Sequence, residues 1–176
     1  MTRIATERLI LRPIEAGDLL PIANAINNLA VSQNLTRVVH PYFPDDFARW
    51  EQRDKRDGHV FSIARDGGII GVVGLESDSI GIEAEIGYWL AEPHWKQGLM
   101  SEAARAARDY GFGSAGYDRL VSGYKHGNEA SRRILIGLGF RHTGHKWAWS
   151  FALKRPVRVA TVELTRREWL RERVRK

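Results

Sequence analysis

Hydrophobic and polar positions repeat with two different periods along the chain, and each period predicts one kind of element. Alternating or short apolar runs suit strands, and here they are bounded by glycine, proline and aspartate. We expect strands within residues 6–18, 59–68, 69–78, 82–92, 118–128, 147–154 and 157–165. Apolar residues three and four apart suit amphipathic helices and predict them at 18–28, 46–56, 99–112 and 128–139, with a charged helical tail at 167–176.

Two of these strands give the clearest hairpin signal in the sequence. HVFSIARDGG and IIGVVGLESD are apolar runs that meet at Asp66-Gly67-Gly68, and aspartate followed by glycine favours a tight hairpin turn. Antiparallel strands followed by strand, helix and strand units predict an α/β fold, with a mixed sheet of about seven strands flanked on both faces by about four helices. Without a repeat or a linker, residues 1–176 are expected to form one domain.

The composition fits a folded domain away from membranes. Hydrophobic residues make up 43% of the 176, which is enough for a sizeable core. The longest uncharged apolar run near the middle, IIGVVGL at residues 69–75, is far shorter than the roughly 20 residues that span a bilayer. The N-terminus alternates charged with apolar residues and lacks the apolar stretch of a secretory signal. We therefore expect a cytoplasmic protein with no membrane partner.

The uneven distribution of charge changes what the net charge of +6 implies. Residues 141–176 hold 11 Lys and Arg against 3 Glu, a local +8, whereas residues 1–140 hold 16 basic and 18 acidic groups. The excess of basic residues is therefore C-terminal, where solvated helix charge is favoured over docking to nucleic acid. Residues 66–95 carry six acidic and no basic residues, which suits either a cationic ligand or solvated strand edges.

The residue types present exclude several kinds of chemistry. The chain has no cysteine, so a thiol nucleophile and a thiolate metal site are excluded and any group transfer must be direct. His142 and His145 are expected to face opposite sides of a strand, which gives no metal site. Trp147 and Trp149 share one face, where packing in the core is favoured over lining a substrate pocket.

A short turn before the helix at 99–112 is the first candidate site. Between Lys96 and Ser101 the backbone N–H groups of the helix start are free and the helix dipole is positive, which favours an anion. Gly98 allows a diphosphate close to the backbone, and Lys96 adds charge at the rim. The GK[ST] ending of a Walker loop and the GxGxxG of a dinucleotide site are both missing, so a nucleotide would be held in another way.

The residues around this turn resemble those of a known superfamily. IGYWLAEPHWKQGLMSEAARAARDYGF, followed by NEASRRILIGLGF, is similar to the GNAT superfamily of acyl-coenzyme A dependent N-acetyltransferases. The opening TERLILRP and the late VELTRREW also match its branch of ribosomal-protein alanine N-acetyltransferases, so the resemblance covers essentially the whole chain. It implies acetyl-coenzyme A (acetyl-CoA) as the acyl donor, with no metal.

The resemblance assigns the coenzyme phosphates to residues of the turn. The family's phosphate motif falls on residues 95–100, and the implied binding residues are Lys96, Gln97, Gly98, Leu99, Met100 and Ser101. Lys96 stands where glycine is common, and Met100 stands where alanine or glycine is common. A long side chain at position 100 would crowd the approach of a diphosphate to the backbone.

The resemblance also implies where the pantetheine arm of the coenzyme lies. A bulge around residues 87–90, in the fourth strand of the predicted sheet, would splay that strand from the one at 118–125. The pantetheine would occupy the gap, held by backbone amides of Trp89 and Leu90 that also polarise the thioester carbonyl.

Two acidic residues before the bulge are candidates for a general base. An amine attacks a thioester only when it is unprotonated, and a lysine-like amine with a pKa of about 10.4 is mostly charged at neutral pH. Glu85 is the first candidate, and Glu83, two residues away on the same strand face, is the reserve. A structural salt bridge or an exposed strand acid is the alternative role for Glu85.

The predicted helix at 128–139 supplies candidates near the departing thiolate. In many GNAT relatives a tyrosine protonates this thiolate, but the matching residue here is Leu135. Ser131 is then the implied hydrogen-bonding group near the sulphur. Asn128 is expected to be the N-cap of this helix, and the resemblance adds a contact to the cofactor.

Together these features predict an N-acetyltransferase that moves an acetyl group from acetyl-CoA to a primary amine by direct attack in a ternary complex. The acceptor is either a protein N-terminus or a small-molecule amine, and a homodimer is a compatible assembly. The alternative is a non-catalytic module of the same fold, which binds an acyl-CoA or a partner of the basic tail. Leu135, Met100 and Lys96 are the residues that favour this alternative.

Overall fold

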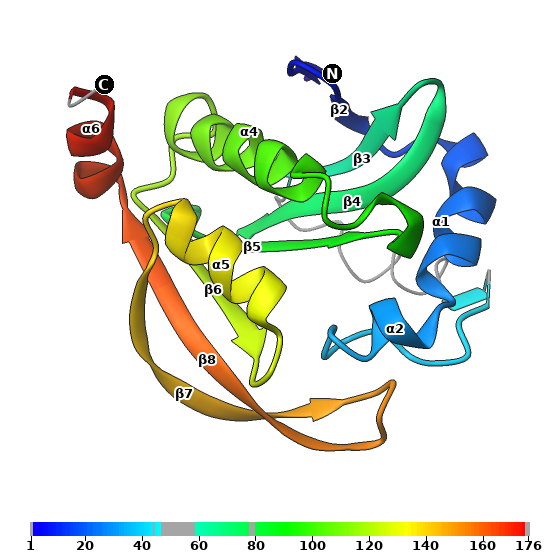
Figure 1. Cartoon of the computed structure of the whole chain (residues 1–176). Coiled ribbons are helices and arrows are strands. Elements are labelled where there is room, and N and C mark those ends of the chain that lie inside the picture. The colour runs from blue at the N-terminus through cyan, green and yellow to red at the C-terminus, as the bar shows by residue number, and fades with distance from the viewer. Residues whose placement is uncertain (1, 44, 47–58, 78–79, 175–176) are drawn as a thin grey trace.

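A single eight-stranded sheet runs through the molecule in the order β1-β2-β3-β4-β5-β6-β8-β7 (Figure 1). The computed structural model describes all residues except 1, 44, 47–58, 78–79 and 175–176. Its strands are β1 (Ile4–Ala5), β2 (Ile10–Pro13), β3 (His59–Arg65), β4 (Gly68–Ser77), β5 (Glu83–Leu90), β6 (Arg119–Lys125), β7 (Arg141–Ser150) and β8 (Arg155–Thr165). Only the pair β5 and β6 is parallel, so the predicted mixed sheet is confirmed.

Five α-helices and two short 3₁₀ helices accompany the sheet in the described part of the chain. They are η1 (Ala16–Asp18), α1 (Leu19–Ile26), α2 (Leu29–Ser32), η2 (Glu92–His94), α4 (Leu99–Gly113), α5 (Glu129–Gly137) and α6 (Arg166–Val174). The helix predicted at 18–28 is confirmed as α1, and α2 follows it as a helix that was not predicted: Asn28 leaves the helical conformation, and its side chain caps α2 by accepting from the Ala30 N–H at 2.8 Å. Most of the helix predicted at 46–56 lies outside the described residues.

The predicted hairpin is confirmed at the turn between β3 and β4. Asp66 and Gly67 both have positive φ, 50° and 82°, as a two-residue turn of type I′ requires. This turn joins β3 to β4, and the antiparallel pairing continues from β4 to β5.

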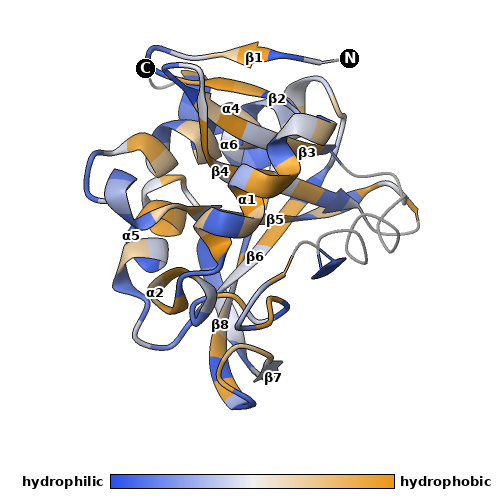
Figure 2. Ribbon diagram, turned by 90° about the vertical axis from the view of Figure 1, so that its right-hand side faces the viewer, coloured by the Kyte–Doolittle hydropathy of each residue, from blue (hydrophilic) through white to orange (hydrophobic). Residues whose placement is uncertain are grey.

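The sheet has a hydrophobic cluster on each face, and helices cover both. Val73, Leu75 and Ile86 belong to the larger cluster, on which α4 packs, whereas Val72 and Trp89 belong to the smaller one beneath α1. The alternation along β4 and β5 thus sends successive side chains to opposite helices, and both strands are hydrophobic along much of their length (Figure 2). Helices on both faces are therefore confirmed.

The splay between β5 and β6 is the feature of the sheet that creates a gap. Their pairing stops at Glu85 with Val121, although β5 continues to Leu90 and β6 to Lys125. The expected bulge does not interrupt the β4–β5 ladder, which keeps one register along its whole length. The strands separate because β6 stays paired with β8 over all its residues and diverges with it. The splay is confirmed, but it arises without a register shift on the β4 side.

The charged C-terminal segment is a docked helix. Trp169 of α6 is 5% exposed and stacks on Phe112 of α4 with ring centroids 5.3 Å apart. The buried Arg108 bonds the Leu138 carbonyl and Glu172, and so joins α4 to the end of α5 and to α6. The expectation of a solvated tail therefore holds only for the outer face of this helix.

Candidate active site

The turn before α4 leaves backbone N–H groups without side-chain partners. Lys96 and Gly98 both have positive φ, 60° and 76°, so the chain reverses sharply and α4 begins at Leu99. Among the described residues no side chain caps this helix. Its first N–H groups and the positive end of its dipole therefore lack a side-chain cap among these residues, which is the arrangement that binds an anion.

The N-terminal segment braces this turn, which the sequence did not indicate. The Arg8 guanidinium donates to the Gln97 carbonyl at 3.0 Å and pairs with Glu102 of α4 at 2.7 Å. Glu102 also accepts from the Thr6 hydroxyl at 2.6 Å and from the Arg8 N–H at 2.8 Å. Burial alone would raise the pKa of the Glu102 carboxyl, but these hydrogen bonds outweigh burial and hold its pKa below the usual value.

Of the side chains in the turn, one stabilises it and another is exposed. Gln97 donates to the Pro93 carbonyl at 3.1 Å and accepts from Arg65 at 2.9 Å, so its side chain stabilises the turn. Lys96 is exposed at the rim. A Cβ at Gly98 would lie 3.5 Å from the Arg8 guanidinium, which brings a second cation to the turn.

Met100 does not crowd the anion site. Its side chain is 8% exposed and belongs to the hydrophobic cluster under α4, as does that of Leu99. Because both point into the core, the turn presents their backbone N–H groups and the half-buried Ser101. The expected steric conflict at position 100 is therefore absent.

The alternation of backbone hydrogen bonds decides which groups face the strand gap. The Ala91 N–H donates to the Ile70 carbonyl of β4. In an antiparallel pair every second residue directs its N–H and C=O to the same neighbouring strand, so the backbone groups of Trp89 also face β4. The backbone groups of Tyr88 and Leu90 then face the gap, whereas the Trp89 amide, which the resemblance placed there, faces β4. The Leu90 carbonyl accepts from the Trp95 indole at 2.7 Å, which leaves its N–H as the gap-facing donor.

Hydroxyl groups line the gap on the side of α5. Asn128 caps α5 as expected, its Oδ1 accepting from the Ser131 N–H at 3.1 Å. The Ser131 hydroxyl lies 3.1 Å from the Tyr88 hydroxyl, so α5 and β5 contact each other across the gap. Leu135 is fully buried and offers no polar group here.

Both candidate bases take part in ion pairs on the opposite face of the sheet. Glu85 accepts from Arg37 at 2.9 Å, and the same guanidinium binds Glu76, which is the cross-strand partner of Glu85. Glu83 pairs with Arg119, its neighbour on β6. The side chain of Glu85 is 43% exposed, so solvent or an acceptor can reach it.

Comparison with known sequences decides the family. The sequence model described as "Acetyltransferase (GNAT) domain" matches residues 8–141, about three quarters of the chain. The chain belongs to the GNAT acetyltransferase family. A curated Bacillus subtilis relative, named uncharacterized protein YkkB, is 30% identical over 155 residues that cover 83% of this chain and 90% of that protein.

Solved structures of GNAT enzymes share the fold. A Vibrio cholerae spermidine N-acetyltransferase, in complex with CoA and spermine, superposes with a TM-score of 0.82 at 23% identity, covering 94% of this chain and 99% of that one. A ribosomal-protein-S5-alanine acetyltransferase from Vibrio fischeri superposes with a TM-score of 0.80 at 19% identity, covering 96% and 99%. At these identities the likeness establishes the fold alone.

The histidines and tryptophans of β7 differ from expectation in this GNAT chain. A register shift between His142 and Gly144 turns His145 to the same side as His142, with ring centroids 4.6 Å apart. The prediction of opposite faces was therefore wrong. Even so, no group of three or more His, Asp or Glu side chains suited to a metal ion occurs among the described residues.

Trp147 and Trp149 are not core residues, because β7 is the outer strand of the sheet and their side chains are 73% and 52% exposed. The expectation of core packing was wrong. The hairpin that carries them reaches the loop after α2, where the Phe151 N–H bonds the Thr36 carbonyl at 3.1 Å.

The helices in the described ranges include none long and apolar enough to cross a membrane.

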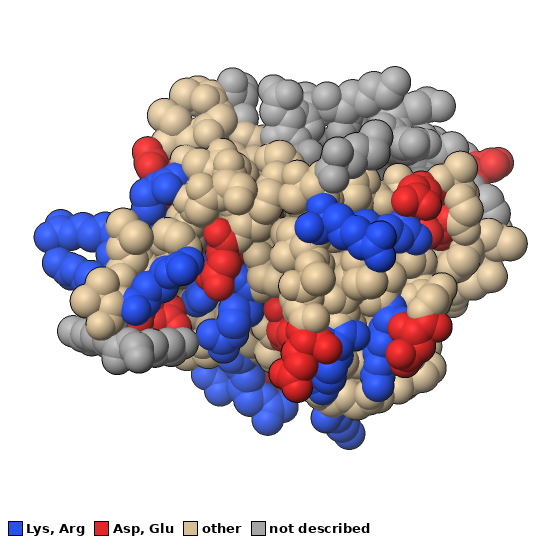
Figure 3. Space-filling view, turned by 90° about the horizontal axis from the view of Figure 1, so that it is seen from above, with Lys and Arg blue, Asp and Glu red and all other residues tan. Residues whose placement is uncertain are grey.

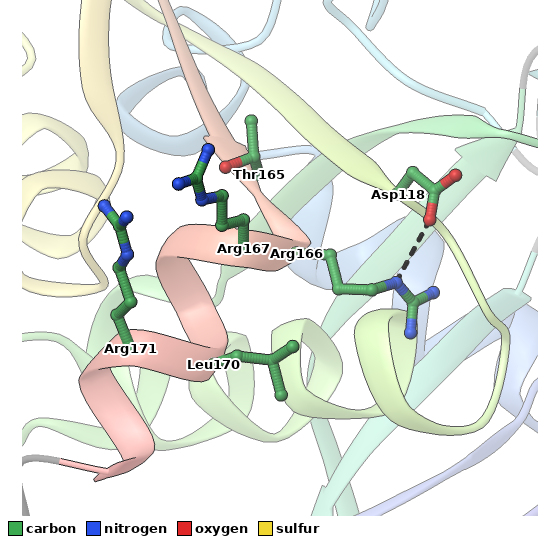
Figure 4. Close-up of a pocket in the computed structure, with 6 residues that line it drawn as sticks. All are labelled: Asp118, Thr165, Arg166, Arg167, Leu170 and Arg171. Carbon is green, nitrogen blue, oxygen red and sulfur yellow. Dashed lines mark hydrogen bonds and ion pairs between the residues drawn. The ribbon is translucent and has the colours of Figure 1, made fainter.

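A hollow of about 520 Å³ beside α6 lies at the opposite end of β6 from the gap (Figure 4). Its lining residues are Asp118, Thr165, Arg166, Arg167, Leu170 and Arg171. The Arg166 guanidinium stabilises the fold, because it donates to Asp118 and to the Phe112 and Tyr117 carbonyls. Basic side chains gather on this side of the molecule, with acidic ones among them (Figure 3). The ion pair between Arg166 and Asp118 is therefore structural.

Proposed function

We propose that this acetyltransferase moves an acetyl group from acetyl-CoA to a primary amine by direct attack in a ternary complex. One observation carries the proposal: the gap between β5 and β6 opens beside a turn with free N–H groups at the start of α4. The turn and the gap suit the two ends of one ligand, a diphosphate and an amide-bearing chain. Acetyl-CoA has both.

The coenzyme would be held mainly by backbone groups. Its diphosphate would accept from the N–H groups of Leu99, Met100 and Ser101, with Lys96 adding positive charge at the rim. Its pantetheine amides would pair with the gap-facing groups of Tyr88 and Leu90, as an added strand pairs with a sheet edge. The side chains of Leu99 and Met100 stay in the core, so this mode of binding needs no rearrangement of the turn.

Glu85 is the proposed general base. As the amine nitrogen bonds to the acetyl carbon, the thioester carbon–sulphur bond breaks and the electron pair stays on sulphur. The proton lost from nitrogen passes to the Glu85 carboxylate, directly or through water. Arg37 restrains this carboxylate in the absence of an acceptor, and the cross-strand pair with Glu76 makes the surrounding surface acidic, which suits a cationic amine.

The acceptor is proposed only as a class. Relatives of the fold include an enzyme named for spermidine, which is a small polyamine, and one named for an alanine of ribosomal protein S5, which is a protein acceptor. Both are primary amines with nearby positive charge or a free chain end. The alternative function is a non-catalytic module that binds acyl-CoA or a partner of the basic tail; of the three residues that favour it, Met100 no longer does so because its side chain is buried, whereas Lys96 and Leu135 still do.

A thermal-shift titration with acetyl-CoA tests the proposal first. Binding at about 100 times the dissociation constant would stabilise the protein by about 2.7 kcal/mol and raise its melting temperature by about 5 to 10 °C. ATP and NAD are the controls and should give no comparable shift. A panel of polyamines, amino acids and N-terminal peptides is then assayed for release of the CoA thiol.

The two functions are separated by these measurements. A selective shift together with thiol release supports the transferase. A selective shift without release from any amine in the panel would support the non-catalytic module. Absence of a shift in the folded protein would overturn the transferase and leave the non-catalytic module that binds a partner through the basic tail.

A further inference from the structure

Three hydroxyl groups gather where β5 and β6 separate, and one of them has a plain structural role. Ser122 is buried and donates to the Ile86 carbonyl at 2.8 Å. Ile86 is the first residue of β5 beyond the last β5–β6 pair, so this bond satisfies a carbonyl that the splay would leave without a partner. The other two hydroxyls, of Tyr88 and Ser131, are not needed to satisfy the backbone.

Tyr88 is placed to control the Ser131 hydroxyl. Its side chain lies on the face of the sheet that carries α5. The Tyr88 hydroxyl oxygen is 3.1 Å from the Ser131 hydroxyl oxygen and 3.4 Å from the Ser131 backbone carbonyl oxygen. Burial raises the pKa of the Tyr88 phenol, and the hydrogen bond with Ser131 lowers it only in part. The phenol therefore keeps its proton at every physiological pH and remains a hydrogen-bond donor.

A serine oxygen that accepts one hydrogen bond has its own proton free to donate elsewhere. The Ser131 N–H is already bonded to Asn128, so the backbone at this position is held and the side chain has few orientations left. If the Tyr88 hydroxyl donates to the Ser131 oxygen, the serine proton turns away from Tyr88 and toward the gap. Accepting a hydrogen bond also makes the serine hydroxyl a stronger donor.

We propose that Tyr88 is a positioning residue that orients the Ser131 hydroxyl toward the sulphur of the departing CoA thiolate. The inference rests on the proposed function, because that function places the thioester in the gap. When the carbon–sulphur bond breaks, the thiolate keeps the electron pair and accepts a hydrogen bond from Ser131. The proton that later neutralises the sulphur comes from solvent. Leu135 supplies no hydroxyl, so Tyr88 and Ser131 together do this work.

The first experiment measures acetyl transfer by Tyr88→Phe, Ser131→Ala and the double variant, with the acceptor found in the amine screen. Tyr88→Phe should lower kcat by about tenfold, because the Ser131 hydroxyl is no longer oriented and its hydrogen bond to the charged thiolate is lost, and leave the KM for acetyl-CoA unchanged. The double variant should be no slower than Ser131→Ala, because both changes remove one unit. Tyr110→Phe is the matched control, since its hydroxyl bonds His59 outside the gap.

A second experiment reads the same contact without turnover. The affinity for CoA, which carries a thiol, is compared with that for acetyl-CoA at about pH 7 and about pH 9, on either side of an ordinary thiol pKa. In the wild-type protein CoA should gain affinity relative to acetyl-CoA as pH rises, because Ser131 binds the thiolate. Tyr88→Phe and Ser131→Ala should both reduce this gain.

The outcomes separate the inference from the proposed function. An active wild-type enzyme with unchanged kcat in Tyr88→Phe would overturn the inference alone, as would a double variant that loses the product of the two single effects. If no amine is acetylated but the pH-dependent gain in CoA affinity is lost in Tyr88→Phe, the positioning role stands and the proposed function fails. If Tyr88→Phe does not fold, Ser131→Ala must still remove the gain, or the inference fails.

Discussion

Several residues owe their role to where their side chain points, which sequence alone leaves open. Met100 stands at a position where a long side chain suggests a damaged site, yet it is buried under α4 and only its backbone meets the anion site. Glu85 stands where a general base is expected, and the structure adds Arg37 as its partner. Glu85 can therefore have one of two roles, as a general base or as the ion-pair partner of Arg37.

Replacing Glu85 with Gln separates these two roles. Loss of a general base is expected to lower kcat by about a hundredfold or more, with acetyl-CoA affinity retained, because the proposed binding mode holds the coenzyme by backbone groups on other residues. Steady-state kinetics and the thermal-shift titration measure the two quantities. Glu76→Gln is the matched control, since it removes the other carboxylate of Arg37. Equal losses in both variants would mean that Glu85 acts only through Arg37.

At the scale of elements, local patterns predicted most helices and strands, because the spacing of hydrophobic residues that distinguishes them repeats within a few consecutive residues. The hairpin at Asp66-Gly67 and the cap at Asn128 follow from turn and cap chemistry that is equally local. The helix α2 was missed because its four residues are too few to show a helical period, although Asn28 caps it. The gap itself came from the family resemblance, and its physical cause, the divergence of β6 with β8, is visible only in the sheet.

The contacts that join elements could not be predicted from sequence. Arg8 and Glu102 are 94 residues apart, and Tyr88 and Ser131 are 43 apart. A charged or polar side chain could pair with many distant residues, and the sequence around it does not indicate which one it contacts. The brace on the phosphate turn and the hydroxyl pair in the gap therefore appeared only with the structure.

The brace at Glu102 predicts a pH-dependent stability. Because the pKa of Glu102 is lowered in the folded protein, its stabilising effect is present above the ordinary carboxyl pKa and is lost as pH falls through the folded value. Glu102→Gln should therefore be less stable than wild type by about 1 to 2 kcal/mol at neutral pH, and this difference should shrink in acid.

Urea unfolding at a series of pH values measures the effect of Glu102→Gln. Glu129→Gln is the matched control, because Glu129 also lies in the first turn of a helix but pairs only with the exposed Arg132. Its effect should stay below about 0.5 kcal/mol, as for other exposed i,i+3 pairs. A difference for Glu102→Gln that does not change with pH would contradict the proposed origin of the stabilisation.

At the scale of the molecule, the C-terminal helix closes the larger core. Trp169 is buried against Phe112, and its indole donates to Asp109 of α4 at 2.8 Å. Arg108 is buried beside it and links α4, α5 and α6. These contacts tie the helix that carries the anion site to the helix that carries Ser131, so the two halves of the site share one packed core.

Trp169→Ala should therefore destabilise the whole domain. Removing a buried tryptophan is expected to cost about 3 to 5 kcal/mol and to lower the melting temperature by about 10 °C for a chain of this size. Denaturant unfolding followed by circular dichroism measures the change. Leu170→Ala is the control, because Leu170 is adjacent but 49% exposed. A small effect of Trp169→Ala would mean that α6 frays independently of the core.

The irregular strand β7 has a consequence for solubility. In the part of the chain that the structure describes, β7 pairs with β8 alone, so its other edge carries unpaired backbone groups beside the exposed Trp147 and Trp149. An open edge that is also straight can pair with strands of neighbouring molecules and aggregate. The register shift at His142 and Gly144 twists the strand, and Lys146 places a charge along it. The kink that brings two histidine rings together thus also keeps the open edge of the sheet from templating aggregates.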